Sequence, residues 1–132
     1  MLIALDMKSS IPIYVQLRNQ IVTGIGRGEL KAGERLPTVR QLAADAGVNT
    51  MTVNKTYQLL RAEGFIEIDR RHGAMVCPAS QCAGLYREKL ERELELLSAE
   101  ARLKGMEKSE FLGLCERMFE QMHPAALRGC EE

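Results

Sequence analysis

The sequence contains no apolar run that approaches the roughly 20 residues needed to cross a bilayer. Its beginning, MLIALDMKSS, lacks the basic flank and the small-residue cleavage site of a signal peptide. We therefore expect a mature, cytoplasmic protein with no membrane partner. At 132 residues, the chain can bury a real core but is too short for a large enzyme fold.

The sequence also has no cysteine or histidine pattern typical of a metal site. No histidine lies at ligand spacing, and no C-x-x-C pair occurs among the four cysteines Cys77, Cys82, Cys115 and Cys130. Because cytosolic thiols stay reduced, we expect free thiols, no metal site and no cofactor. A thiol sensor or a metal site at these cysteines stays open as an alternative.

Net charge is absent too, since 18 Lys and Arg balance 18 Asp and Glu. This balance hides a difference between the two parts of the chain. Residues 1–78 hold ten Lys and Arg against seven Asp and Glu, whereas residues 79–132 hold eight against eleven. A mildly basic first part favours a polyanion as partner, and the acidic second part does not.

Apolar spacing predicts a first helix over residues 11–26. Pro12 suits the first turn of a helix, and the residues that follow at the spacing of one buried helical face are Tyr14, Leu17, Ile21 and Ile25. The next segment, GRGELKAGERLP, has three glycines and a proline among charged residues. This composition predicts a connector whose Leu30 and Leu36 lie in the core.

Two shorter helices follow the connector. Thr38 and Gln41 fit a capping box at the start of the second helix, and Gly47 suits its end. Asn49 is a good N-cap for a third helix that runs to Gly64. Two short helices joined by about three residues around a glycine describe a helix-turn-helix.

The third helix is followed by two short runs typical of β-strands, residues 65–69 and 74–77. Between them lies a polar tip, Arg70-Arg71-His72-Gly73. A helix, a helix-turn-helix and a basic hairpin together make a winged helix-turn-helix. The predicted fold is therefore mainly α with a small β-hairpin.

The third helix begins with poor helix formers that have short hydrogen-bonding side chains, in the stretch GVNTMTVNKTY. Val53, Tyr57 and Leu60 mark its buried face, so a rotation of about 100° per residue points Met51 and Lys55 outward. Such a compact polar turn fits the major groove of B-DNA, where amides and hydroxyls approach base edges and methyl groups touch thymine. Its unpaired N–H groups also suit a phosphate.

The surface that we expect to bind double-stranded DNA combines this turn with the second helix and the hairpin tip. Each of its residues also has an ordinary explanation as a helix cap, a solvated side chain or a polar turn. Their convergence on one face of a helix-turn-helix favours DNA binding. The predicted DNA-binding residues are Arg40, Asn49, Thr50, Met51, Thr52, Asn54, Lys55, Arg70, Arg71 and His72.

The second part of the chain, residues 79–132, has a different period. Leucines spaced by four and three residues predict a narrow seam like that of a coiled coil, ending near Gly105, and a final helix runs until Pro124. Two helices of this length cannot enclose a core alone, so we expect a second copy of the chain to cover them. The predicted dimerisation residues are Leu90, Leu94, Leu97, Ala101, Phe111, Leu114 and Met118.

A series of short motifs runs through residues 12–76. It includes Pro12-Ile-Tyr-x-Gln16, Leu36-Pro37-Thr38-x-Arg40, Gly47-Val48-Asn49, Tyr57-x-x-Leu60 and Glu63-Gly64-Phe65-Ile66. In this order the series resembles the N-terminal DNA-binding domain of the GntR family of bacterial transcription regulators. The short helical tail is similar to the YtrA-type branch of that family, whose C-terminal part serves dimerisation.

The resemblance implies a non-enzymatic homodimer that binds a palindromic operator and usually represses transcription. It also implies that Arg40 contacts a base or phosphate at the groove edge and that the wing reaches the minor groove. The family often has an Arg where this chain has Thr50 and Asn54, so we expect a different base preference that includes adenine. The wing has Arg71-His72-Gly73 in place of the common Gly-x-Gly, which constrains the hairpin and adds a cation.

Two alternatives to a plain repressor stay open. In the first, a thiol, a metal ion or an unknown small-molecule effector at the tail controls DNA binding, with Cys77 and Cys82 near the joint between the two parts. In the second, the chain is a protein-interaction module, since winged helices also serve as scaffolds. The sequence does not identify the operator, the regulated genes or an effector.

Overall fold

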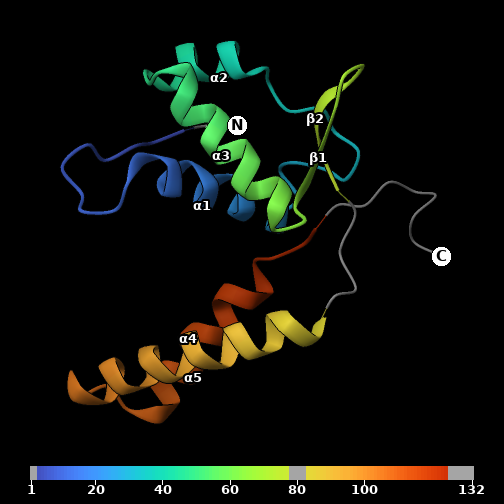
Figure 1. Cartoon of the computed structure of the whole chain (residues 1–132). Helices are drawn as coiled ribbons and strands as arrows, with labels where there is room; N and C mark the ends of the chain where they lie inside the picture. Colours follow the sequence, from blue (N-terminus) through green and yellow to red (C-terminus); the bar gives the residue numbers. More distant parts are fainter. Residues whose placement is uncertain (1–2, 78–82, 125–132) are drawn as a thin grey trace. The chain divides into compact units, whose positions relative to one another are not determined.

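The computed structural model describes residues 3–77 and 83–124 (Figure 1). The chain divides into two compact units: the described residues up to 77 belong to the first, and those from 83 to 122 form the second. The elements, in chain order, are α1 (Ile13–Gly26), α2 (Val39–Ala46), α3 (Thr50–Ala62), β1 (Ile66–Asp69), β2 (Gly73–Val76), α4 (Ala83–Leu103) and α5 (Lys108–Glu120). The predicted fold class, mainly α with a small β-hairpin, is confirmed.

The core of the first unit lies around α3. In Figure 1, α3 runs between α1 and α2, with the hairpin near its C-terminal end. The contacts agree with this view, because α3 packs against α1, α2 and β1. Leu17 and Ile21 of α1 meet Val53 and Leu60 of α3 in this core, and all four side chains are fully buried. The predicted burial of the connector leucines Leu30 and Leu36 is confirmed as well.

Local sequence signals set most helix ends. The capping box of α2 is complete, since the Thr38 side chain accepts from the Gln41 backbone N–H and the Gln41 side chain accepts from the Thr38 N–H. Gly47 follows α2 in the left-handed region, at φ 71°, which favours glycine. The first helix begins at Ile13 and not at residue 11, because the backbone of Pro12 is still extended.

The hairpin is antiparallel, and its register pairs Ile66 with Val76 and Asp69 with Gly73. Residues 33–36 of the predicted connector pair with the outer edge of β2, which the sequence did not indicate. The Leu36 N–H donates to Ala74 O at 2.8 Å, and the Gly33 N–H donates to Val76 O at 2.7 Å. This edge satisfies backbone groups of β2 and fixes the base of the wing against the core.

A polar clamp that the sequence analysis missed fixes the chain before α1. Gln16 Oε1 accepts from the Asp6 N–H at 2.8 Å, and Gln16 Nε2 donates to Asp6 O at 3.0 Å and to Ile11 O at 2.8 Å. One turn further along α1, Gln20 Oε1 accepts from the Ala4 N–H at 2.9 Å. The segment before α1 is therefore held on the first unit by side-chain hydrogen bonds.

The second unit is an amphipathic helix pair that leaves an apolar surface exposed. Gly105, at φ 86°, lies in the turn between α4 and α5. No described side chain of residues 86–124 is buried. Among the predicted dimerisation residues, Leu90, Leu94, Leu97 and Met118 are exposed, and Ala101, Phe111 and Leu114 are half-buried. Across the described residues, no helix combines the length and the apolar character needed to cross a membrane.

Candidate nucleic-acid interface

The first turn of α3 is held by its cap. Asn49 has an extended backbone, and its Oδ1 accepts from the Thr52 N–H at 2.8 Å. The turn between α2 and α3 is fixed in addition by the Val48 N–H, which donates to Ala43 O at 3.0 Å. One of the unpaired donors at the start of α3 is thus satisfied by the Asn49 side chain, and one of the unpaired carbonyls at the end of α2 is satisfied by the Val48 N–H.

The outward face of this turn is open. The Met51 side chain is 80% exposed, and Thr50, Asn54 and Lys55 are exposed as well, while Thr52 is half-buried. The predicted orientation of α3 is therefore correct. A surface of hydroxyl, amide, thioether and ammonium groups faces solvent.

The opposite face of α3 is fixed by hydrogen bonds as well as by packing. Thr56, which the sequence analysis did not place in the core, is fully buried, and its Oγ1 lies 3.1 Å from Tyr14 O and 3.0 Å from Thr52 O. The helical spacing of Thr56 from Val53 could have identified it as buried. A threonine is tolerated at this position because its hydroxyl donates to these carbonyls.

Tyr57 ties α3 to the segment that precedes α2. Its hydroxyl donates to Pro37 O at 2.7 Å, and burial raises the pKa of this phenol. Pro37 directly precedes Thr38, the N-cap of α2. The bond therefore fixes the start of α2 relative to the middle of α3.

Lys55 lies at the edge of α3 that faces α1. Its Nζ is 4.0 Å from the centre of the Tyr14 ring, a distance typical of a cation–π contact. Lys55 was predicted to point outward, and its contact with Tyr14 was not predicted. The contact holds one positive charge beside the exposed turn of α3.

Arg40 is exposed in the first turn of α2. Within the part of the chain that the structure describes, Arg40 forms no ion pair. It lies between Thr38 and Gln41, the two residues of the capping box, so the backbone that presents it is well fixed. Its guanidinium is available to a ligand that approaches the start of α2.

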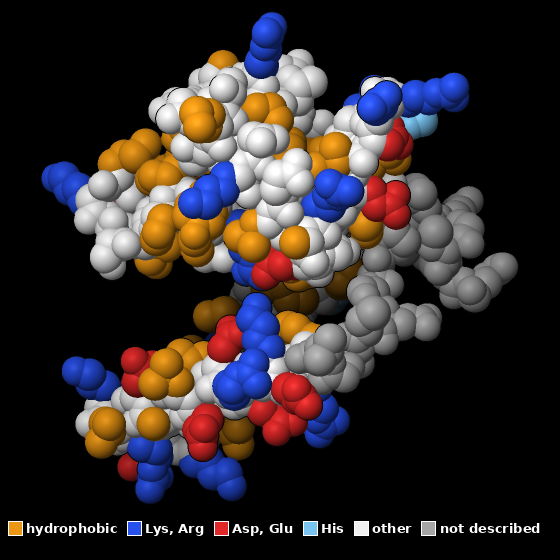
Figure 2. All heavy atoms as spheres, in the orientation of Figure 1, with side chains coloured by type: hydrophobic (Ala, Val, Ile, Leu, Met, Phe, Trp, Pro, Cys, Tyr) orange, Lys and Arg blue, Asp and Glu red, His pale blue; other side chains and the backbone are white. Residues whose placement is uncertain are grey.

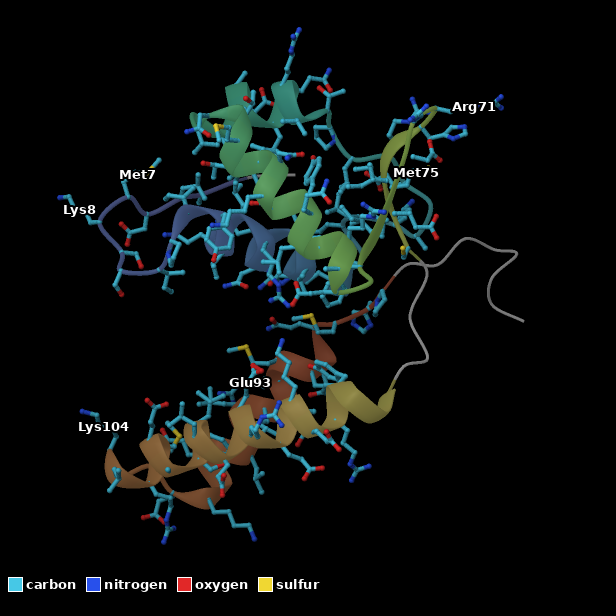
Figure 3. The ribbon with its side chains drawn as sticks, viewed as in Figure 1. Met7, Lys8, Arg71, Met75, Glu93 and Lys104 are labelled. Atoms are coloured by element: carbon cyan, nitrogen blue, oxygen red, sulfur yellow. The ribbon has the colours of Figure 1, made fainter. Side chains whose placement is uncertain are left out.

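The wing tip combines two exposed arginines with a closed turn. Asp69 Oδ1 accepts from the His72 backbone N–H, and Asp69 Oδ2 lies 3.2 Å from His72 Nδ1. These hydrogen bonds lower the pKa of Asp69. Arg70 and Arg71 are exposed at the turn, and in Figure 3 Arg71 projects from the end of the hairpin into solvent.

The predicted DNA-binding residues lie on or next to three elements of the first unit: α2, α3 and the hairpin tip. In Figure 1, α2 and the hairpin tip both lie at the top of the view. Figure 2 shows Lys and Arg side chains projecting from several separate points of this unit and not from one continuous basic patch. The arrangement offers a polar helix turn flanked by single cations, which suits spaced phosphates better than a compact anion.

The cysteines show no metal cluster within the described residues, where no group of three or more His, Cys, Asp and Glu could hold a metal ion. Cys77 is half-buried, and its pKa is raised by burial and by the charge of Glu67. A raised pKa disfavours the reactive thiolate. Cys115 is a free, exposed thiol. Cys82 and Cys130 lie outside the described residues, and with Cys82 so does part of the thiol control considered as an alternative.

Comparison with known proteins gives the family. The family model for "Bacterial regulatory proteins, gntR family" matches residues 13–76. YhcF of Bacillus subtilis, named an uncharacterized HTH-type transcriptional regulator, is 34% identical over 108 residues, which cover 81% of this chain and 89% of YhcF. The chain belongs to the GntR family. It is a helix-turn-helix transcriptional regulator and not an enzyme.

Relatives named YtrA support the YtrA-like assignment within the GntR family. The Bacillus subtilis HTH-type transcriptional repressor YtrA is 40% identical over 75 residues, which cover 57% of this chain and 58% of that protein. The structure of YtrA from Sulfolobus acidocaldarius, described as a GntR-family transcription factor, is 40% identical with a TM-score of 0.59. It covers 70% of this chain, and the match spans 97% of the solved chain.

Two further structures share the fold at lower identity. A transcriptional antiterminator from Listeria monocytogenes matches with a TM-score of 0.83 at 22% identity, over 98% of each chain. The DNA-binding domain of AraR, solved in complex with operator ORX1, matches with a TM-score of 0.52 at 23% identity, over 56% of this chain and 93% of that one. At these identities the likeness concerns the fold.

We predict that Tyr57→Phe lowers the free energy of unfolding by about 1 kcal/mol, because Pro37 O loses its hydrogen-bond donor while the aromatic ring still fills the core. Urea unfolding of the full chain, followed by circular dichroism, measures the change. Tyr86→Phe is the matched control, since the Tyr86 side chain is exposed on α4. Equal midpoints for the two variants would show that the Tyr57 hydroxyl adds no stability.

Proposed function

We propose that this GntR-family regulator is a repressor that binds a palindromic operator as a homodimer. The observation that supports it most is the two-sided character of α3. Its first two turns expose Thr50, Met51 and Asn54, while Val53 and Tyr57 on its other side are buried in the first unit. A helix with one face packed in the core and a polar face exposed to solvent can insert the polar face into a major groove while its packing stays intact.

Base contacts are assigned to the open turn of α3 and to Arg40. Asn54 has an amide that can bond to adenine, and the methyl groups of Thr50 and Met51 suit thymine. Asn49 uses its Oδ1 for the cap, so we assign it mainly to holding the turn, with its amide nitrogen facing a phosphate. Arg40, free of ion pairs among the described residues, is assigned a bidentate contact to guanine.

Contacts to the DNA backbone are assigned to the flanking cations. Lys55 stands over Tyr14 at one edge of α3. Arg70 and Arg71 extend from the wing, where a narrow minor groove attracts arginine. His72 closes the wing turn through Asp69, so its assigned role is to shape the tip that enters the groove. The DNA-binding domain of AraR, solved in complex with an operator, supports DNA binding by the shared fold.

The second unit is assigned to dimerisation. Leu94, Leu97 and Met118 are exposed on helices that bury no described side chain, and a second copy of the same chain can cover them. Ion pairs such as Arg87 with Glu91 give α4 a polar side as well, which leaves the leucines as its contact surface. A twofold dimer presents two copies of α3, and this symmetry requires a palindromic operator.

Selection of bound sequences from random duplexes tests the proposal. We expect a palindrome whose half-site centres lie roughly 34 to 36 Å apart, about one helical turn. Arg40→Ala should then weaken binding to this operator by about 1 to 3 kcal/mol and relax the preference at one base position in each half-site. Dissociation constants for the operator and for its single-base variants measure both effects.

Arg27→Ala is the control for this experiment, because Arg27 is exposed just after α1 and away from the proposed surface. Enrichment of non-palindromic sequences, or of none, would contradict the proposed function. A loss of affinity in Arg40→Ala that is uniform at every base position would instead assign Arg40 to a phosphate.

For the dimer, we predict that the double variant Leu94→Glu with Leu97→Glu is monomeric, since burying four new carboxylates in the interface is unfavourable. Sedimentation equilibrium should give a mass near that of one chain, 14.8 kDa, whereas the unchanged protein gives twice that mass. Ala99→Glu is the control, because Ala99 lies about 200° around α4 from Leu97 and is exposed. A double variant that still dimerises would place the interface elsewhere.

A further inference from the structure

An ordered turn that holds a lysine precedes α1. This N-terminal turn comprises residues 6–11. Asp6 Oδ1 accepts from the Lys8 N–H at 3.0 Å, Asp6 O accepts from the Ser9 N–H at 3.2 Å, and Ser9 Oγ accepts from the Ile11 N–H at 3.1 Å. The turn thus has its own hydrogen bonds, and Asp6, its acidic residue, is used to close it.

The N-terminal turn is clamped to α1 but exposes its side chains. Gln16 bonds to the backbone of Asp6 and Ile11 at both ends of the turn, through its amide oxygen and its amide nitrogen. Yet the Met7 side chain is 63% exposed, and Lys8 is exposed too. Ile3 and Leu5 before the turn and Ile13 after it pack against the core, but within the turn itself hydrogen bonds and not apolar burial fix the backbone that presents Lys8.

The position of the turn relative to α3 suggests what it contacts. In Figure 3, Lys8 and Arg71 lie on opposite sides of the first unit, with α3 between them. Lys55 lies on the Lys8 side of α3, because it contacts Tyr14 in the first turn of α1, just after the N-terminal turn. Cations therefore flank α3 on both sides: the wing on one, and Lys55 with Lys8 on the other.

DNA geometry places phosphates on both sides of such a helix. The major groove is about 12 Å wide and is bordered by both backbones, so a helix inside it lies between two rows of phosphates. Resting on the proposed function, we propose that Lys8, presented by the N-terminal turn, binds a phosphate of the DNA backbone on the side of α3 opposite to the wing. Gln16 is the positioning residue, because its amide fixes both ends of the turn.

The test is the salt dependence of the dissociation constant, measured with the full-length chain and its selected operator. A lost phosphate contact lowers the slope of log K against log salt by about 0.9, so Lys8→Gln should lower it by about 1.8 for a dimer. The loss should be equal on a random duplex, because a phosphate contact holds no sequence information. Lys104→Gln, which removes the same charge just after α4, should leave the slope unchanged.

Gln16→Ala tests the positioning role. It should lower the slope as much as Lys8→Gln does, and Lys8→Gln should cause no further decrease in the Gln16→Ala background. Circular dichroism verifies that both variants are folded, and Lys8→Gln alone decides the matter if Gln16→Ala is not. Additive losses from the two substitutions would contradict the positioning role of Gln16.

Two results would overturn the Lys8 contact while the proposed function stands. One is operator binding by Lys8→Gln with the slope of the unchanged protein. The other is an equal decrease in Lys104→Gln, which would indicate a general charge effect. Failure of the unchanged protein to bind any selected duplex would instead overturn the proposed function itself.

Discussion

The attachment of α3 to the first unit is the constraint on which the candidate interface depends. The stretch that opens this helix is rich in threonine and asparagine, which form helices poorly by themselves. Interactions with the rest of the first unit keep these residues helical. Val53 and Leu60 are fully buried. The hydroxyls of Thr56 and Tyr57 donate hydrogen bonds to backbone carbonyls of other segments. Packing and tertiary hydrogen bonds thus compensate for low propensity.

Contacts of α3 also position the wing and the start of α2. Arg18 of α1 forms a two-point contact with Glu63 at the end of α3, at 2.9 and 3.0 Å, and stacks over Phe65 before β1. The wing therefore continues from a fixed helix end. Tyr57 performs a similar role at Pro37, before α2. Arg40 of α2 and the arginines of the wing are therefore both positioned by segments that are attached to α3.

Local signals made most of this arrangement predictable. Caps and turns depend on residues close in sequence, so Thr38, Gly47 and Asn49 gave correct helix ends. The outward face of α3 followed from its period. Features that need the approach of distant backbone were not predictable in the same way. Two examples are the pairing of residues 33–36 with β2 and the hydrogen bonds from Gln16 to the Asp6 backbone. Neither follows a periodic pattern in the sequence, and both use backbone groups, which do not depend on the residue type.

Methyl NMR of Met51 in the full-length chain tests most directly whether the open turn of α3 is the part that meets DNA. The Met51 side chain is 80% exposed in the free protein, so a soluble paramagnetic agent should broaden its methyl signal strongly. On addition of the selected operator, the account predicts that this signal shifts and becomes protected from the agent. An operator-bound protein in which the Met51 methyl stays as accessible as before would contradict it.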